Sequence, residues 1–440
     1  MKKNRITIVL LSLTFGLIQA QQKKWTLHEC VEYALENNIT IKQAELDLES
    51  IELDKIDALG NFLPSLNGRA SLTESIGLGT NPTTGVLENQ AVMSVSPGLF
   101  SSVTLFDGLR NLNRLNRAKL SAIANQYRLD DIKDDIRLFV ANAYLRVVSD
   151  RESLKVQQAQ YESTKQDLQR TKELVDAGIV PEGDLFEIEA TAATQEQSIV
   201  NAENTLRISK ISLAQLLLIT DYESFDISEE DYLVPASTIF DVSPKGVYEK
   251  ALTFRNDIKL SQSNVELAEK DVKISKGASY PTLSAFMNYN TRWADNINLG
   301  FVEQFWTFDG MSYGLQLDIP IFNGFANKNA IKRSQINLER SKLQLQQDKL
   351  DLEATVNQAY TDAIGAAKTY EAAQKTLKAR KTAFGYSQER FNVGLLNSFD
   401  FNQSKQAVVQ AEAQVVRSKY DYIFRLKVLE FYFGIPISQL

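Results

Sequence analysis

The sequence predicts an α+β membrane protein that is built from one duplicated unit: a helix, a β-hairpin and a long helix. Three observations lead to this fold class. Two stretches without Pro, residues 109–177 and 325–393, are long enough for helices of roughly 100 Å. Strand-like alternation of apolar and polar residues precedes each of them. Positions in the two halves correspond at a constant offset of 216 or 217 residues, which indicates an internal repeat.

The N-terminus is typical of a secretory signal peptide. Lys2, Lys3 and Arg5 precede an apolar segment, 6–18, and the small residue Ala20. Such a segment is too short and wrongly flanked for a membrane helix. We therefore expect residues 1–20 to be cleaved and the protein to be exported. No Cys stands at the expected cleavage junction, so a lipid anchor is not expected.

Composition argues against several functional classes. The 440-residue chain has a net charge of −7, which becomes −10 without Lys2, Lys3 and Arg5, and this acidity argues against a nucleic-acid partner. Cys30 is the only Cys and His28 the only His. A single chain therefore cannot form a disulfide or assemble a multi-ligand site for a soft metal. We expect no cofactor, no bound metal and no catalytic residue.

The long helices are predicted to pack as coiled coils. Apolar residues recur every seventh position, and adding 216 to each number again gives an apolar residue; one such line is Leu115, Ala122, Leu129, Ile136 and Ala143. A seven-residue repeat indicates left-handed supercoiling. A second apolar flank, at Ile336, Leu343 and Leu350, predicts neighbours on more than one side, as in a wall of helices. An ordinary coiled-coil stalk has the same periodicity and is the alternative.

Two segments that precede the long helices, about 63–107 and about 280–323, are predicted β-hairpins. Each begins at a Pro, Pro64 or Pro281, and then alternates apolar and polar residues. One apolar face and strands of about 9–11 residues are typical of a transmembrane β-barrel. A soluble pair of hairpins is the alternative. Four strands are too few for a membrane barrel, and an open edge in lipid leaves backbone groups unsatisfied. The barrel must then be shared, and two or three copies both fit.

Each long helix ends at a short tip, from which a return helix, about 184–218 or about 400–433, runs back. Gly178 and Gly394 stand just past the long helices, and Asp184 and Asp400 stand at the start of the return helices. Gly caps a helix C-terminus and Asp favours a helix N-terminus, so helix capping alone would explain these residues. Residues 221–244 are a predicted linker between a first repeat at 21–220 and a second repeat at 245–440.

In this order and doubled, the motifs resemble those of the TolC-like outer-membrane efflux proteins over essentially the whole mature chain. The motifs are the opening Thr26-Leu27…Ala34-Leu35…Asn37-Asn38, the two strands that begin at Pro, the turns Phe106-Asp107-Gly108 and Phe322-Asn323-Gly324, and the Gly tips with their downstream Asp. One departure is Thr104, where the second repeat has Pro320, and we expect it to affect only the local strand geometry.

The resemblance implies a homotrimer in the outer membrane of a Gram-negative-type bacterium, in contact with outer-membrane lipid. It implies a twelve-stranded β-barrel, a long periplasmic coiled-coil α-barrel of twelve helices, and an equatorial belt formed by the linker and the C-terminal end. Such a protein is an exit duct of a tripartite efflux or type I secretion system and catalyses nothing. It receives substrates from an inner-membrane transporter through a periplasmic adaptor protein.

The resemblance also implies functional residues at the tips. The residues expected to dock on an adaptor are Ala177, Gly178, Ile179, Val393, Gly394 and Leu395. Asp400 matches the family's acidic constriction ring, Asp184 stands at the other tip, and Gln403 replaces a second family acid one helical turn on. Arg390 is a candidate tether of the closed state, and a solvated surface Arg is the alternative.

Three other classes fit the sequence less well. A periplasmic coiled-coil stalk or adhesin without channel activity explains the long helices but not the amphipathic hairpins, and it is the main alternative. An enzyme would need clustered acid, base or metal-binding groups. A periplasmic adaptor has a helical hairpin, but it should lack two hairpins of barrel-like strands.

Overall fold

The structure is a computed structural model that describes residues 23–82, 84–229, 232–235 and 237–435. The predicted signal peptide, 1–20, lies outside these residues. The chain divides into two compact units. Unit 1 comprises the described residues up to Gln43, residues 129–255 and those from Lys349 onward, and unit 2 comprises 44–128 and 256–348. Both long helices contribute residues to both units.

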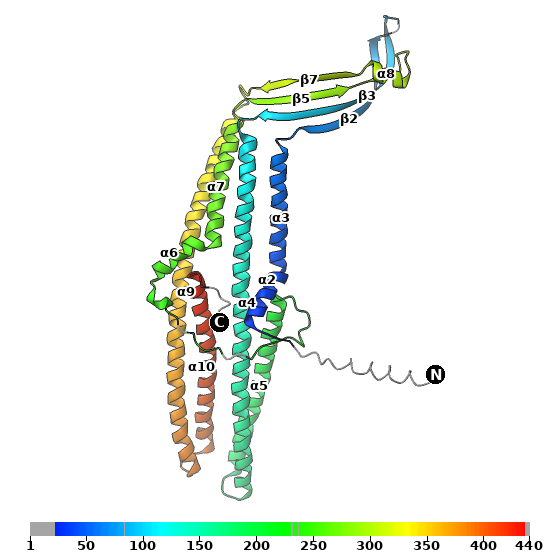
Figure 1. The fold of residues 1–440 in the computed structure, drawn as a ribbon. Coiled ribbons are helices and arrows are strands. Elements are labelled where there is room, and N and C mark those ends of the chain that lie inside the picture. The colour runs from blue at the N-terminus through cyan, green and yellow to red at the C-terminus, as the bar shows by residue number, and fades with distance from the viewer. Residues whose placement is uncertain (1–22, 83, 230–231, 236, 436–440) are drawn as a thin grey trace, which may run out of the picture. The chain divides into compact units, whose positions relative to one another are not determined.

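The two repeats share four long helices, which follow one another in the same order with the same lengths of 11, 22, 67 and 35 residues (Figure 1). In the first repeat these helices are α2 (Leu27–Asn37), α3 (Ile39–Gly60), α4 (Arg110–Asp176) and α5 (Glu182–Leu216). In the second they are α6 (Pro244–Phe254), α7 (Asn256–Gly277), α9 (Ala326–Asn392) and α10 (Ser398–Tyr432). The predicted duplication is therefore confirmed.

The opening helical segment of each repeat is broken, which the sequence analysis did not predict. Asn38 and Arg255 have extended backbone, with ψ of 131° and 130°, and separate α2 from α3 and α6 from α7. The Asn38 side chain restarts the helix, because its Oδ1 accepts the N–H of Thr40 at 2.8 Å. In the described part of the chain, no helix has a stretch long and apolar enough to cross a membrane.

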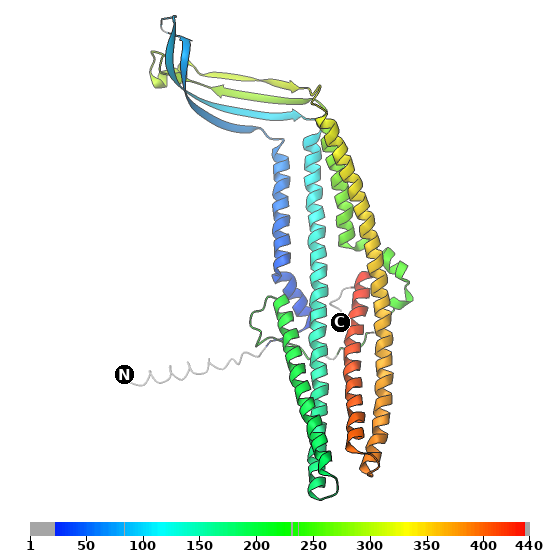
Figure 2. The ribbon, with the colours of Figure 1, turned by 180° about the vertical axis from the view of Figure 1, so that it is seen from behind.

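Unit 2 contains a sheet of four long antiparallel strands in the order β2-β3-β5-β7. The strands are β2 (Ser65–Thr80), β3 (Leu87–Phe106), β5 (Thr282–Asn290) and β7 (Gly310–Asp318), and both views show them side by side (Figure 1, Figure 2). The second hairpin also carries a two-residue strand, β6 (Trp293–Ala294), and a short helix, α8 (Phe301–Thr307), which the predicted hairpin at about 280–323 did not include. β2 and β7 are the two edges of the sheet.

The β3–β5 pair joins the two hairpins, and it sets which side chains share a face. Leu99 lies opposite Tyr289 and Val103 opposite Ala285. The pairing continues outward with Leu72 opposite Val95 and with Leu315 opposite Ala285. Because side chains alternate along a strand, these residues lie on one face of the sheet. The predicted apolar face is therefore continuous from β2 to β7.

Each hairpin passes into its long helix through two successive residues in the left-handed backbone region. They are Gly108 and Leu109, with φ of 71° and 64°, and Gly324 and Phe325, with φ of 61° and 69°. The buried Asp107 carboxylate then accepts the N–H of Asn111 at 2.9 Å, which satisfies one of the free donors at the start of α4. The turn motifs noted in the sequence are therefore helix entries.

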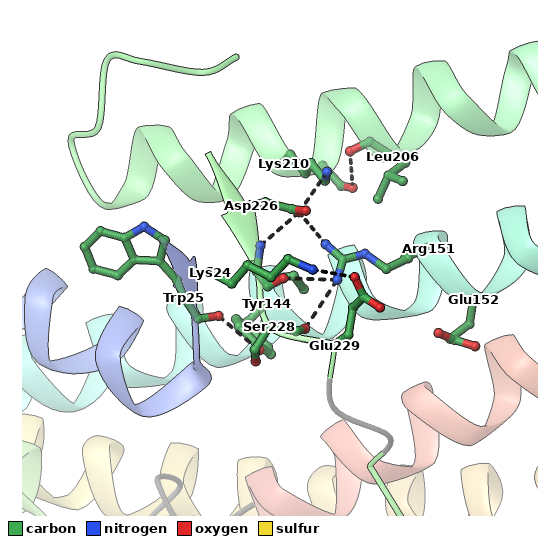
Figure 3. A network of polar contacts seen from close by, with 12 residues as sticks. Lys24, Trp25, Tyr144, Arg151, Glu152, Leu206, Lys210, Asp226, Ser228 and Glu229 are labelled. Carbon is green, nitrogen blue, oxygen red and sulfur yellow. Dashed lines mark hydrogen bonds and ion pairs between the residues drawn. The ribbon is translucent and has the colours of Figure 1, made fainter. Parts of the chain in front are cut away.

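In unit 1 the linker is tied to the first repeat by a polar network (Figure 3). Its strand β4 (Asp226–Ile227) pairs in parallel with β1 (Lys24–Trp25), and a single 3-10 turn, Ile239–Asp241, follows. The buried Arg151 on α4 donates to the Ile227 carbonyl at 3.1 Å and forms an ion pair with Asp226, which Lys210 on α5 also contacts at 2.8 Å. Apolar packing and this network together fix the linker against α4 and α5.

Candidate functional site

Both tips use the same helix ending. At the end of α4 the Ile179 N–H donates to the Leu174 carbonyl at 2.9 Å, while Gly178 N–H donates to Val175 at 2.8 Å. At the end of α9 the Leu395 N–H donates to Arg390 at 2.8 Å, and Gly394 N–H donates to Phe391 at 3.1 Å. These bonds define a Schellman motif at each tip. It requires a left-handed residue, and Gly178 and Gly394 have φ of 69° and 74°.

The tips expose apolar side chains. Ile179, Val393 and Leu395 are each exposed to 68–69%. Ala177 and both glycines are exposed as well, so all six residues predicted to dock on an adaptor lie at the surface of unit 1. Isolated apolar residues are common on protein surfaces, but several together on two adjacent turns form a patch suited to a protein partner.

Asp400 is held at the N-terminus of α10 by the N-cap residue Asn397. The Asp400 N–H donates to Asn397 Oδ1 at 2.8 Å, and Asn397 Nδ2 donates to the Asp400 carboxylate at 3.0 Å. Asp184 stands at the matching position of α5, but the residue that corresponds to Asn397 is Pro181, which has no side-chain cap. The capping interpretation therefore fits Asp400. Its carboxylate nevertheless stays exposed, so capping leaves it available for a second role.

Seven of the predicted site residues line one of two hollows of unit 1. A hollow of about 870 Å³ is lined by Asp400 and Gln403 together with Glu187, Phe399 and Arg380, which the sequence analysis did not single out. A second hollow of about 830 Å³ lies between the tips, and its lining includes Asp184, Ile179, Val393, Gly394 and Leu395. Asp400 and Asp184 therefore line different members of this pair of hollows.

Arg390 faces its own tip. Its Nη2 donates to the Leu395 carbonyl at 3.4 Å, which places the positive charge at the C-terminal end of α9. A cation in this position interacts favourably with the helix dipole and with the last carbonyl groups. The side chain is exposed. This contact stabilises the turn of the tip.

Two features that hold the tips together were not predicted. The rings of Phe391 and Phe401 stack with centroids 4.4 Å apart, which fixes the end of α9 against the start of α10. Lys405, on α10, forms an ion pair with Asp167 on α4, and its side chain is only 8% exposed. The two residues are 238 positions apart on different helices, and no local sequence pattern links them, so the pair becomes visible only in the structure.

Over residues 23–82, 84–229, 232–235 and 237–435, no group of three or more His, Cys, Asp or Glu side chains is placed to hold a metal ion. Cys30 is buried, and desolvation raises the pKa of its thiol to about 12. Its thiolate form is therefore negligible at neutral pH, and the residue packs as a small apolar group.

Comparison with known proteins gives a consistent result. The profile of the family described as "Outer membrane efflux protein" matches residues 30–217 and 247–434. The chain is 23% identical to Protein CyaE of Bordetella pertussis over 84% of this chain and 75% of that protein. It is 20% identical to the outer membrane protein TolC of Salmonella enteritidis over 99% and 87%. The structure resembles the CmeC outer membrane channel of Campylobacter jejuni with a TM-score of 0.80 and 19% identity, covering 93% and 85%.

Proposed function

We propose that this chain, which belongs to the outer membrane efflux protein family, forms with two further copies a closed duct whose periplasmic entrance lies at the tips of the long helices. Members of the family are non-enzymatic outer-membrane channels of tripartite efflux and secretion systems, with a periplasmic extension, and this protein is such a channel. The family implies a trimer that works with partner transporters.

The observation that carries the proposal is the open sheet of unit 2. β2 and β7 are both edges, and side chains on the apolar face are exposed, among them Leu72 at 68% and Leu315 at 67%. An apolar face is stable in lipid, but a free edge is not, because lipid offers no hydrogen-bond partner to the backbone. Pairing β7 of one copy with β2 of the next removes every edge. Three copies then give twelve strands, within the range of membrane barrels.

The tips are the proposed docking site for a periplasmic adaptor protein that brings substrate from an inner-membrane transporter. The support is the exposed apolar patch of Ile179, Val393 and Leu395, together with the hollow that these residues line. Burial of the patch against such a partner would stabilise the complex by the hydrophobic effect.

Asp400 is the proposed constriction residue. In a trimer three exposed Asp400 carboxylates would surround the entrance, with Gln403 one turn above and Asp184 on the neighbouring tip. A ring of carboxylates attracts cations and repels anions. Opening would then require the tip helices to move apart, as in other hinge and shear motions of packed helices. Arg390 remains a proposed tether of the closed state, although its contact with Leu395 lies within its own tip.

Single-channel recording with native mass measurement tests this proposal. Detergent-purified protein should have the mass of a trimer and give small, cation-favouring currents in a planar bilayer. Asp400→Ala should reduce the cation preference, whereas Asp184→Ala, the matched acid of the other tip, should have a smaller effect. If the Asp400→Ala channel keeps the cation preference of the wild type, Asp400 does not form the proposed constriction ring. A protein that stays soluble without detergent and never inserts supports the coiled-coil stalk instead.

A further inference from the structure

The two repeats of unit 2 match contact by contact, not only helix by helix. Asn111 Nδ2, on α4, donates to the Asn61 carbonyl at the end of α3, at 3.3 Å. Asn327 Nδ2, on α9, donates to the Ala278 carbonyl at the end of α7, at 2.7 Å. Asn327 follows Asn111 by 216 residues and Ala278 follows Asn61 by 217. These two offsets therefore identify which residues of the two repeats are equivalent.

Inside the chain, the second repeat contacts the first along a seam between α7 and α4. Arg117 Nε lies 2.6 Å from Asp271 Oδ1 across this seam, with both side chains about half exposed. Nearer the sheet, the backbones of Gly108 and Gly277 touch: a Cβ on Gly108 would lie 2.4 Å from the Gly277 carbonyl oxygen. No residue with a side chain fits at this contact.

The same offsets identify four residues that lie on the outer sides of the repeats. Arg117 corresponds to Arg333 and Asp271 corresponds to Asp54, so the opposite charges are kept. The side chains of Arg333 and Asp54 are exposed, and in the described part of the chain neither has a hydrogen-bond or ion-pair partner. Gly108 corresponds to Gly324 and Gly277 to Gly60, and a Cβ on either of these would meet nothing within 4 Å.

Gly60 is the informative residue of this set. Its φ is not in the left-handed region, so its backbone does not require glycine. It is the last residue of α3. Nothing in the single chain explains why a side chain is absent there. The equivalent Gly277 is explained by its contact with Gly108.

We propose that a second copy of this chain docks on the α3 side through a copy of the internal seam. This proposal rests on the trimeric duct proposed above and specifies its contacts. Arg333 of one copy forms an ion pair with Asp54 of the next, and Gly324 lies against Gly60. The positive Arg333 and the negative Asp54 make the two surfaces complementary in charge. The open space at Gly324 and Gly60 allows the backbones of the two copies to touch.

The same offsets extend the inference to the sheet. Applying the same offsets to the β3–β5 register predicts that Leu315 of β7 lies opposite Leu72 of the neighbouring β2, and that Asp318 lies opposite Arg69. Leu315 and Leu72 lie on the apolar face established above, so the predicted register keeps that face continuous. A slip by one residue would turn β2 over and bring apolar and polar faces together. The Asp318–Arg69 pair adds a cross-strand attraction on the other face.

A charge exchange tests the helical part of the seam. Asp54→Arg and Arg333→Asp should each lower the temperature at which the detergent-purified trimer dissociates, and the double variant should regain most of the loss. Asp271→Arg, at the matched position inside the chain, should lower the unfolding temperature of the protomer instead. A wild-type trimer that is insensitive to both single exchanges contradicts this inference and leaves the duct intact. A wild-type protein that is monomeric contradicts the proposed duct itself.

Gly60→Ala and a cysteine pair complete the test. Gly60→Ala should weaken the trimer, although a Cβ at Gly60 meets nothing within 4 Å in the single chain. Gly365→Ala is the control and should leave the trimer unchanged, because the equivalent position in the first repeat already carries a side chain, that of Ser149.

A cysteine pair tests the strand register. In a Cys30→Ala background, Leu72→Cys with Leu315→Cys should form disulfides between copies, seen as dimers and trimers on a denaturing gel. Ser71→Cys with Leu315→Cys should not. Cross-links of the second pair alone would show a different register and overturn the proposed one.

Discussion

Lys405 and Asp167 form an ion pair that joins the return helix of the second repeat to the long helix of the first, just above the tips. The equivalent positions on the outer sides of the repeats are Glu189 and Ala383, which cannot form such a pair. In the proposed trimer, the contact between copies would therefore lack the charge pair that the contact within the chain carries near the tips.

Removing this contact should loosen the entrance. Lys405→Met leaves the Asp167 carboxylate partly buried without its partner, and we expect a loss of about 2 kcal/mol of stability, together with longer or larger channel openings. Thermal unfolding and single-channel recording measure the two effects. Lys381→Met is the control, because the Lys381–Glu412 pair is more exposed and should contribute less than about 1 kcal/mol. Equal losses in both variants would contradict a special role of Lys405.

Leu218→Gly should stabilise the protein. Leu218 follows α5 with φ of 59°, and its N–H and that of Ile219 form the same helix ending as at the tips. The matching residue after α10 is Gly434, with φ of 91°. Release of the left-handed strain exceeds the added chain entropy of glycine, so we expect a gain of roughly 0.5–1 kcal/mol. Chemical denaturation measures it, and a loss of stability would contradict the prediction. Gly434→Ala should act in the opposite direction.

The linker network should make stability depend on pH in the acid range. Burial raises the pKa of Asp226, but the hydrogen bond from Lys210, the charges of Arg151 and Lys210, and the Ile227 N–H outweigh it, so that its pKa is lowered overall. The stabilisation is then fully present above the unfolded pKa of about 3.9 and is lost as the pH falls through the lower folded value. Asp226→Asn should therefore lower the unfolding temperature at pH 7, and the difference from wild type should shrink in strong acid. A difference independent of pH would contradict this.

Cys30 should resist thiol reagents while the protein is folded. Its side chain is fully buried and its thiol pKa is raised to about 12, so both access and ionisation are suppressed at pH 8. Iodoacetamide should leave the native mass unchanged for hours and add one group when denaturant is present. Rapid alkylation of the native protein would show that the α2 region opens readily.

Local patterns were enough to predict the elements and their duplication. The long helices followed from the absence of Pro and the seven-residue spacing, and the tips followed from Gly178 and Gly394, since only a left-handed residue ends a helix in this way. The break at Asn38 was missed because Asn is also tolerated within helices. The helix α8 was missed because it is held by tertiary contacts: the buried Gln304 side chain bonds the Ala294 N–H and three carbonyl groups around it.

Contacts between distant residues were beyond the same reasoning. The pairs Arg151–Asp226 and Lys405–Asp167 join elements whose approach depends on the whole packing arrangement, and a charged residue at such a position has the same appearance in the sequence as a solvated one. The internal repeat partly removes this limit. Once Arg117 and Asp271 are known to meet, the sequence alone identifies Arg333 and Asp54 as their counterparts.

The two hairpins differ in one respect that matters at the cell surface. β2 and β3 contain 16 and 20 residues, whereas β5 and β7 contain nine each. In the proposed duct the first hairpin of each chain would therefore project beyond the second hairpins on either side. The barrel would contain six hairpins, but only three of them would reach the outer rim. An antibody that recognises the projecting ends of β2 and β3 would find three equal binding sites per duct, one on each chain.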